Sequence, residues 1–258
     1  MSPAERVKVW VGEVQDLSVF AGRTMAALVR RPWPGKETIE QMDLLGVGSL
    51  GIVILTGLFA GMALAMQFSI ELSVFGAKSY LGRAVTVSIL RELGPVLTGL
   101  MVAGRVCSGI TAELGAMKVT QQIDALRVLG SDPIRKLVVP RLVAVVTMLP
   151  ILTVISDAMA IVGGYSIALF VSRIGSPIYW AEVGRAFTFE NVIGALTKPF
   201  VFGVIIALVG CYEGLRTAGG TKGIGRATTR AVVLASVLIL VANFLLTKLL
   251  VELMGWET

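Results

Sequence analysis

The chain has 258 residues, of which 55% are hydrophobic and only 16% are charged, and its mean hydropathy is +0.82. Soluble domains average about 45–50% apolar and about 25% charged residues, so this composition excludes an ordinary soluble protein and indicates an integral membrane protein. Histidine is absent and the two cysteines lie in apolar stretches, which argues against a His/Cys metal centre and a disulfide framework. The formal net charge of +6 fits a membrane protein with basic cytoplasmic loops, and we expect no nucleic-acid partner.

Residues 1–40 are predicted to form an amphipathic helix region that lies on the membrane surface. Charged residues occupy much of one helical face, which is typical of an interfacial helix and not of a signal peptide. The opposite face has apolar residues at helical spacing, namely Val7, Trp10, Val11, Val14, Leu17, Ala21, Met25 and Leu28. Pro32 and Pro34 end the helix.

Five later stretches are long and apolar enough to cross a bilayer, for which about 20 residues suffice. We expect these spans at about 44–68, 85–112, 142–171, 192–212 and 231–250. They make residues 41–258 one all-α transmembrane domain. In the first span, Gly57 and Gly61 are separated by three residues, a spacing of small residues that allows close contact with another helix.

Lysine and arginine residues are concentrated in alternate connections between the spans. The N-terminal region and the loops 113–141 and 213–230 hold most of them, whereas the loops 71–82 and 172–190 hold few. The positive-inside rule therefore places the N-terminus in the cytoplasm and the C-terminus outside, in agreement with five spans.

A short amphipathic segment, Val119 to Leu129, follows the second span. Its Ile123, Leu126 and Leu129 recur every three residues and give one apolar face, and Gly130 suits a helix end. Such a face needs burial, either against the chain's own helices or in a groove of another protein. We predict the second. The expected polar rim consists of Gln121, Gln122 and Asp124, and Arg127 is expected to form an ion pair with the partner.

Arg91 and Glu92 lie near the beginning of the second span. A charge at bilayer depth costs several kcal/mol, about 2.5–3.5 on insertion scales, so these residues either sit at the membrane surface or face the protein interior. Adjacent helix residues point about 100° apart, so the two cannot both face one ligand squarely. The guanidinium of Arg91 suits a phosphate, and Glu92 can pair with Lys198 or with Arg91.

Three more charged residues lie in or beside the apolar spans. Arg105 and Glu113 are about two turns apart in the same predicted helix, which favours a structural charge network near its cytoplasmic end. Asp157, in the third span, has no partner that is obvious from the sequence. It is either a functional acid, as expected by default of an intramembrane carboxylate, or a partner of Arg105.

The glycine-rich, basic residues 218–229 do not form a nucleotide site. They lack the G-x-x-x-x-G-K-[ST] pattern of a P-loop, and no strand precedes them. The sequence also lacks a Ser/His, Cys/His or H-E-x-x-H arrangement. We therefore expect no catalytic residue and no cofactor in this chain.

Several longer motifs resemble those of one family. They are RELGPVLTGL from Arg91, AGR from Ala103, AELGAM from Ala112, QIDAL from Gln122, DP at Asp132, PR at Pro140 and GIGRATTRAVV from Gly223. Together they resemble the MlaE/YrbE permeases, the membrane subunits of MCE-type ABC transporters that move phospholipids in diderm bacteria and related organelles. The resemblance covers about residues 40–250. Gln121 stands where the family commonly has Glu.

The resemblance implies a homodimer in the inner membrane, driven by a separate cytoplasmic ABC ATPase that binds ATP and Mg. The further partners that it implies are a periplasmic MCE-domain hexamer and, in some systems, a STAS-domain protein. It also implies a phospholipid pocket that opens toward the periplasm between the subunits. The positions that match pocket residues are Gln67, Tyr80, Arg91, Glu92, Lys198 and Asn243. Residues 119–129 match the coupling helix that docks on the ATPase.

Two other functions stay open at this point. The chain could be a permease for a different hydrophobic substrate, such as a sterol or a mycolate-like lipid. Alternatively, it could be a membrane scaffold that anchors the MCE ring without transporting anything.

Overall fold

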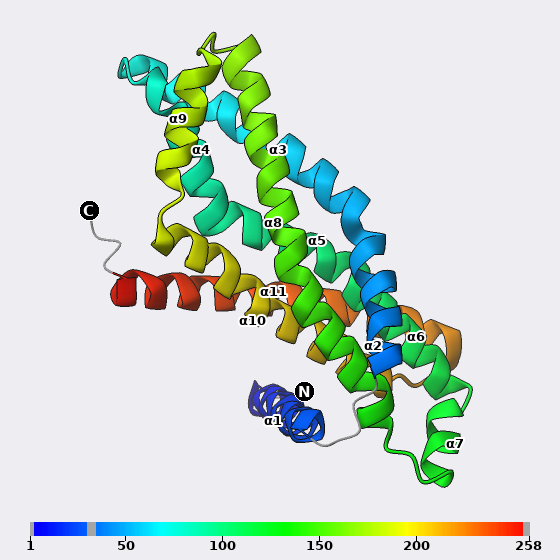
Figure 1. Ribbon diagram of the computed structural model, residues 1–258. Coiled ribbons are helices and arrows are strands. Elements are labelled where there is room, and N and C mark those ends of the chain that lie inside the picture. Colours follow the sequence, from blue (N-terminus) through cyan, green and yellow to red (C-terminus); the bar gives the residue numbers. More distant parts are fainter. Residues whose placement is uncertain (1–2, 30–34, 255–258) are drawn as a thin grey trace. The chain divides into compact units, whose positions relative to one another are not determined.

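The computed structural model describes the backbone of residues 3–29 and 35–254, and within these ranges every regular element is a helix (Figure 1). Helix α1 spans Pro3–Val29, where the sequence predicts the amphipathic helix. Part of the apolar face predicted for it, Val7, Trp10, Val11 and Val14, lies outside the described side chains.

Five helical stretches are long and apolar enough to cross a membrane. They are Gly35–Val74, Lys78–Val119, Ile134–Phe170, Phe189–Leu215 and Gly220–Leu253. Each encloses one predicted span to within one residue, so the all-α fold class and the five spans are confirmed. The stretches are longer than predicted because the helices continue into the polar residues that flank each apolar run.

Most of these stretches contain several elements. The first comprises α2 (Gly35–Gln41), η1 (Met42–Gly46), η2 (Val47–Ser49) and α3 (Leu50–Val74). The second comprises η3 (Lys78–Tyr80), α4 (Leu81–Ser88), η4 (Ile89–Leu93), α5 (Gly94–Val102), η5 (Ala103–Cys107) and α6 (Ser108–Val119). The others comprise η6 (Ile134–Val138) with α8 (Val139–Phe170), then α10 (Phe189–Leu215) and α11 (Gly220–Met254). The elements η1, η4, η5 and η6 are π-helical turns, which are frequent at functional sites.

Two short helices lie between the spans. Helix α7 (Gln122–Val128) falls within the predicted amphipathic segment. Helix α9 (Ser176–Ala186) was not predicted, because residues 172–190 were expected to form a loop. Its sequence signals are nevertheless clear: Pro177 stands in the first turn, and Tyr179, Val183 and Ala186 recur at helical spacing and are buried.

The described chain divides into two compact units, and each of the five stretches contributes to both. The first unit comprises Met1–Leu45, Ala103–Val145 and Val204–Ser236. The second comprises Gly46–Val102, Val146–Gly203 and Val237–Thr258.

Close packing of α3 on α8 organises the second unit (Figure 1). A Cβ atom on Gly57 would lie 2.5 Å from the carbonyl oxygen of Ser156, and one on Gly61 would overlap the backbone of Ala160. Gly163 in turn lies against the carbonyl oxygen of Leu58. The close helix contact predicted from Gly57 and Gly61 is therefore confirmed, with small residues facing small residues.

Helix α4 packs against α9 in the same unit. The buried core here includes Leu81 and Val85 of α4 and Tyr179 and Val183 of α9. The hydroxyl of Tyr179 donates a hydrogen bond to the carbonyl oxygen of Ile161, at 2.9 Å, which satisfies the one polar atom of this fully buried ring. These contacts fix the two walls of the site described below.

In the first unit, α6 packs against the second half of α10. The Thr111 hydroxyl donates to the carbonyl oxygen of Gly210, at 3.1 Å, and Gly214 lies against Leu114. Helix α1 is joined to this unit by ion pairs from Asp16 to Arg216, at 2.8 Å, and from Glu13 to Arg230, at 3.5 Å.

Candidate functional site

Arg91 and Glu92, both in the π turn η4, point to different partners in the second unit. The Arg91 Nε donates to the Asn191 Oδ1 at 2.6 Å. The Glu92 carboxylate instead accepts hydrogen bonds from Lys198, at 2.8 Å, and from two residues of α11. Neighbouring helix residues point in different directions, as expected. Arg91 therefore faces Asn191, whereas Glu92 faces Lys198 and α11.

Glu92 is the centre of a hydrogen-bonded cluster formed by Glu92, Lys198, Asn243 and Thr247, which we call the Glu92 cluster. Its carboxylate accepts from the Asn243 amide at 2.8 Å and from the Thr247 hydroxyl at 2.7 Å. The Lys198 side chain is 0% exposed, and the Glu92 side chain is 38% exposed. The cluster therefore ties η4, α10 and α11 together around a fully buried ammonium and a partly exposed carboxylate.

Lys198 uses all three of its donors. Besides Glu92, its ammonium donates to the Thr247 hydroxyl at 2.9 Å and to the backbone carbonyl oxygen of Arg91. That carbonyl lies four residues before Pro95, which has no N–H to complete the usual helical hydrogen bond. Lys198 thus satisfies a backbone acceptor that the proline leaves open, and it holds the turn that carries Arg91.

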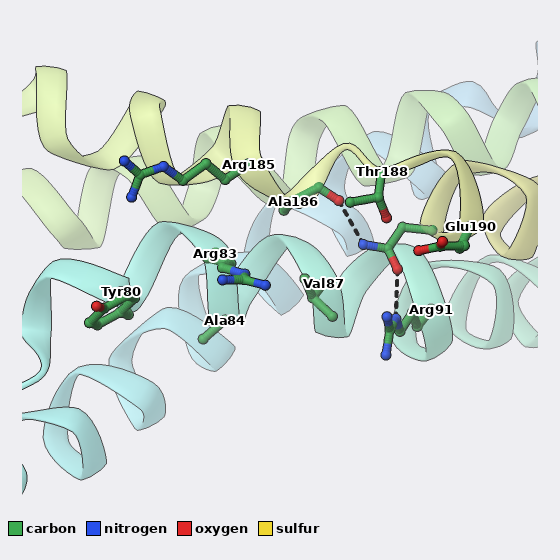
Figure 2. A pocket seen from close by; sticks show the side chains of 10 residues that line it. Tyr80, Arg83, Ala84, Val87, Arg91, Arg185, Ala186, Thr188 and Glu190 are labelled. Atoms are coloured by element: carbon green, nitrogen blue, oxygen red, sulfur yellow. Dashed lines mark hydrogen bonds between the residues drawn. The ribbon is translucent and has the colours of Figure 1, made fainter. Parts of the chain in front are cut away.

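A hollow of about 430 Å³ lies beside Arg91 (Figure 2). One wall comes from the start of the second stretch, the other from the end of α9 and the connection into α10. Its lining residues are Tyr80, Arg83, Ala84, Val87, Arg91, Arg185, Ala186, Thr188, Glu190 and Asn191. With three arginines and one glutamate, the hollow favours an anion.

Asn191 orients Arg91, one of the three arginines that line this hollow. Its amide Nδ2 donates to the carbonyl oxygen of Ala186 at 2.7 Å, while its Oδ1 accepts from Arg91 (Figure 2). Asn191 is itself only 2% exposed. A guanidinium held in this way presents a fixed, planar set of donors, which suits a phosphate better than a flexible lysine does.

The structure separates the six predicted lipid-binding residues into three groups. Tyr80 and Arg91 line the hollow. Glu92, Lys198 and Asn243 belong to the Glu92 cluster, and of the two pairings considered for Glu92 the structure forms the one with Lys198. Gln67 stands apart: it is exposed, donates to Glu71 at 3.3 Å and does not line the hollow.

Thr247 of the Glu92 cluster and most residues that line the hollow, among them Arg83, Arg185 and Asn191, were missed by the sequence reasoning. Thr247 follows Asn243 by one helical turn, a spacing that places both on one face and could have indicated it. Arg83 precedes Arg91 by about two turns and also lines the hollow, although it was not among the predicted site residues. Arg185 comes from the region expected to be a loop and Asn191 from its junction with the fourth span, and no local pattern connects them with Arg91.

Helix α7 agrees only in part with the expected docking surface. Leu129 is 78% exposed and its neighbour Val128 is 88% exposed, so both are accessible to a partner. Ile123 is fully buried by its own chain and is therefore a packing residue, which corrects the prediction of a single apolar face. Asp124 pairs internally with Lys118 at 3.0 Å and with Arg127 at 3.3 Å.

The ends of α7 are set by the backbone. Gln121 adopts a left-handed conformation (φ 60°) at the turn from α6, and Gly130 does so after the helix (φ 73°). The Ser131 N–H donates to the carbonyl oxygen of Leu126, which closes the last turn. Gln122 and Leu126 lie between these fixed ends, exposed and partly exposed respectively.

The predicted charge network of Arg105, Glu113 and Asp157 is not formed. Glu113 pairs with Arg141, at 2.6 Å, and the Arg141 side chain is only 5% exposed. Arg105 is exposed and has no ion pair with a residue that the structure describes. Arg105 lies in the π turn η5 and Glu113 in α6, so the regular helical spacing behind the predicted network does not hold between them. The buried Oδ1 of Asp157 has no hydrogen-bond partner among the described residues.

Comparisons with known proteins agree with this architecture. Residues 38–249 match the family described as Permease MlaE. A probable ABC transporter permease protein of Rickettsia conorii is 40% identical over 248 residues, which cover 96% of each chain. The intermembrane phospholipid transport system permease protein MlaE of Haemophilus influenzae is 36% identical over 228 residues, 87% of each chain.

A chloroplast protein of Arabidopsis thaliana, TRIGALACTOSYLDIACYLGLYCEROL 1, is 36% identical over 240 residues, which cover 93% of this chain and 68% of that protein. The family match spans most of the chain, and the relatives extend over nearly all of it. Together with the five apolar helical stretches, these matches establish a multi-pass membrane protein of the ABC transporter permease kind: the chain belongs to the MlaE permease family.

Proposed function

We propose that this chain is the membrane-spanning subunit of an ABC transporter that moves phospholipids between the inner membrane and a periplasmic MCE-domain protein. The observation that carries the proposal is the cationic hollow, in which Arg83, Arg91 and Arg185 surround a space of about 430 Å³. A phosphate diester is the anion that a membrane supplies in quantity. The name of the Haemophilus relative refers to phospholipid transport and points to the same substrate class.

In this proposal, Arg91 binds the lipid phosphate. Its Nε is held by Asn191, and the turn that carries it is held by Lys198. The Glu92 cluster acts by positioning: it neutralises Lys198 and joins η4 to α10 and α11, so that a movement of either helix reaches Arg91. Tyr80, which is 53% exposed at the rim, offers a hydroxyl to the head group.

The energy comes from a separate ABC ATPase, which binds ATP and Mg, because the sequence holds no P-loop. Val128 at the end of α7 and the adjoining Leu129, both exposed, enter a groove of that ATPase, with Gln121, Gln122 and Arg127 at the rim. The Lys118–Asp124 ion pair links α7 to α6 and so to the second span.

The working unit in this proposal is a homodimer in the inner membrane with the N-terminus in the cytoplasm and the C-terminus in the periplasm. The loop charges support this orientation. The periplasmic partner is an MCE-domain hexamer, and in some systems a STAS-domain protein joins the ATPase, as the family resemblance implies.

The test uses the complete transporter in proteoliposomes, with a fluorescent phospholipid and the MCE protein as acceptor. Arg91→Ala should reduce ATP-dependent transfer at least tenfold, since a charge-assisted, two-donor contact is lost. Arg91→Lys should transfer more lipid than Arg91→Ala but less than the wild type, because lysine keeps the positive charge but lacks the planar pair of guanidinium donors. Lys248→Ala, a control at an exposed pair with Glu252, should leave transfer unchanged.

The outcomes distinguish the alternative functions. Transfer by Arg91→Ala at the wild-type rate would remove the hollow from the mechanism. An assembled wild-type complex that transfers no lipid would support an anchoring role instead. Sterols in place of phospholipids among the molecules that co-purify, identified by mass spectrometry, would support a different hydrophobic substrate.

A further inference from the structure

Asp157 is a buried acid without a partner in a membrane-spanning helix. It lies in α8 and is only 4% exposed. Its Oδ1 is buried and receives no hydrogen bond from any described residue. This oxygen lies where a Cβ atom on residue 94 would be. Glycine at this position therefore leaves room for the carboxyl group, but it has no side chain that could donate a hydrogen bond.

Such a residue is unfavourable for stability. A buried polar group without a hydrogen bond costs about 1–3 kcal/mol, and an intramembrane acid is costly as well. A leucine of similar size would fill the same space without that cost. The arrangement therefore indicates that a donor reaches Asp157 from outside the chain at some stage of the working cycle.

A cavity of about 190 Å³ shows where that donor can enter. Asp157 lines it and is the single polar side chain among the described residues that do so. Leu90 and Ile161 form buried walls, and Val154, Phe187 and Val192 are exposed at the rim. The cavity is thus an apolar recess with one carboxyl group in its wall.

The cavity is adjacent to the cationic hollow, and the two share their supporting segments. In the connection from α9 to α10, Ala186, Thr188 and Asn191 line the hollow, whereas Phe187 and Val192 line the cavity. In η4, Arg91 faces the hollow and Leu90 faces the cavity. A molecule with an anionic and a cationic group in succession would meet complementary charges on the two sides of this connection.

We infer that the cavity at Asp157 is a subsite for the primary ammonium of a phospholipid head group. This inference rests on the proposed function, because it names the head group of the same substrate. A primary ammonium brings three N–H donors and a positive charge, and both complement the carboxyl group of Asp157 that lines the cavity. A choline head group carries a cation but has no N–H, so Asp157 discriminates between the two lipids.

The test measures selectivity with the intact transporter in nanodiscs that contain equal amounts of phosphatidylethanolamine and phosphatidylcholine. Lipid that remains bound is quantified by native mass spectrometry. The wild type should retain phosphatidylethanolamine over phosphatidylcholine by roughly tenfold, as expected for one charge-assisted hydrogen bond. Asp157→Leu should bring this ratio close to one.

A second variant tests the cavity without changing the acid. Ala158, which lines the cavity and is exposed, becomes a larger obstacle in Ala158→Leu, and the ratio should again approach one. Asp157→Leu should melt no lower than the wild type, because it removes an acid that has no partner. A wild-type ratio of one, or an unchanged ratio in either variant, overturns the inference and leaves water or an acyl chain as the occupant.

Arg91→Ala separates this inference from the proposed function. It should lower the retention of both lipids equally and leave their ratio unchanged. Loss of selectivity in Asp157→Leu together with normal retention in Arg91→Ala would reject the cationic hollow and keep the subsite. The reverse result would reject the subsite and keep the hollow.

Discussion

The ammonium of Lys198 donates a hydrogen bond to the backbone carbonyl oxygen of Arg91, four residues before Pro95. One side chain of α10 thereby completes the backbone of the second span where a proline interrupts it. The same ammonium pairs with Glu92. The Lys198 Nζ therefore both provides a donor for the backbone carbonyl oxygen of Arg91 and neutralises the Glu92 carboxylate.

Lys198→Met should destabilise the protein by about 3 kcal/mol, at the lower end of the range for broken buried ion pairs, because the Glu92 side chain is 38% exposed. Thermal unfolding of the purified protein in detergent measures the effect. The double variant Lys198→Met/Glu92→Gln should recover part of the loss, since no unpaired charge remains. Lys248→Met, at a pair in which both side chains are over 60% exposed, should change stability little. Equal effects of the Lys198 and Lys248 variants would contradict this account of the cluster.

Gly61→Ala should destabilise the contact of α3 with α8 by about 1–3 kcal/mol, because a Cβ atom there overlaps the backbone of Ala160. Gly51→Ala in the same helix should have the opposite sign, a gain of about 0.5–1 kcal/mol, because its Cβ meets open space. The melting temperatures of the two variants provide the comparison. A shift in the same direction for both would show that helix propensity, and not close packing, determines the result.

Leu129→Asp should prevent the ATPase from co-purifying with the permease while leaving the melting temperature unchanged, since Leu129 is 78% exposed. Ile123→Ala should show the converse behaviour, with a stability loss of about 2–5 kcal/mol, because Ile123 is fully buried. Leu126 is partly exposed, and Leu126→Asp should show both effects in weaker form. Normal ATPase binding by Leu129→Asp would remove this end of α7 from the contact.

Cysteines introduced at Ser176 and at Thr221 should react with a membrane-impermeant thiol reagent from opposite sides of the membrane. The first position begins α9 and the second lies at the start of α11. Both native cysteines, Cys107 and Cys211, are buried, so background labelling should be low. Labelling of both positions from one side would rule out the predicted orientation.

The sequence was most informative where one chemical requirement dominated. Bilayer thickness fixes the five spans, and the cost of an intramembrane charge led to the pair of Glu92 with Lys198. Gly57 and Gly61 indicated a close helix contact, although only the structure shows that Ser156 and Ala160 face them.

Other features depend on geometry that no local pattern contains. Glu113 pairs with Arg141 and not with Arg105 because the crossing of α6 and α8 decides which cation comes near. The π turns η4 and η5 change the direction in which the following side chains of the second span point. A prediction based on a regular helical repeat does not include this change. Arg185 reaches the hollow from α9 and Asn191 from the start of α10, and no local pattern connects either residue with Arg91.

Helix α1 is held by two kinds of attachment along its length. Toward its C-terminal end, Thr24 and Ala27 are buried, whereas its preceding turns contribute Glu13 and Asp16 to exposed ion pairs. Counterions screen exposed charges over a Debye length of about 8 Å at physiological ionic strength and hardly affect apolar packing. Salt should therefore loosen the Glu13 and Asp16 end first, which makes this end of α1 responsive to the ionic composition of the medium while its other end stays in place.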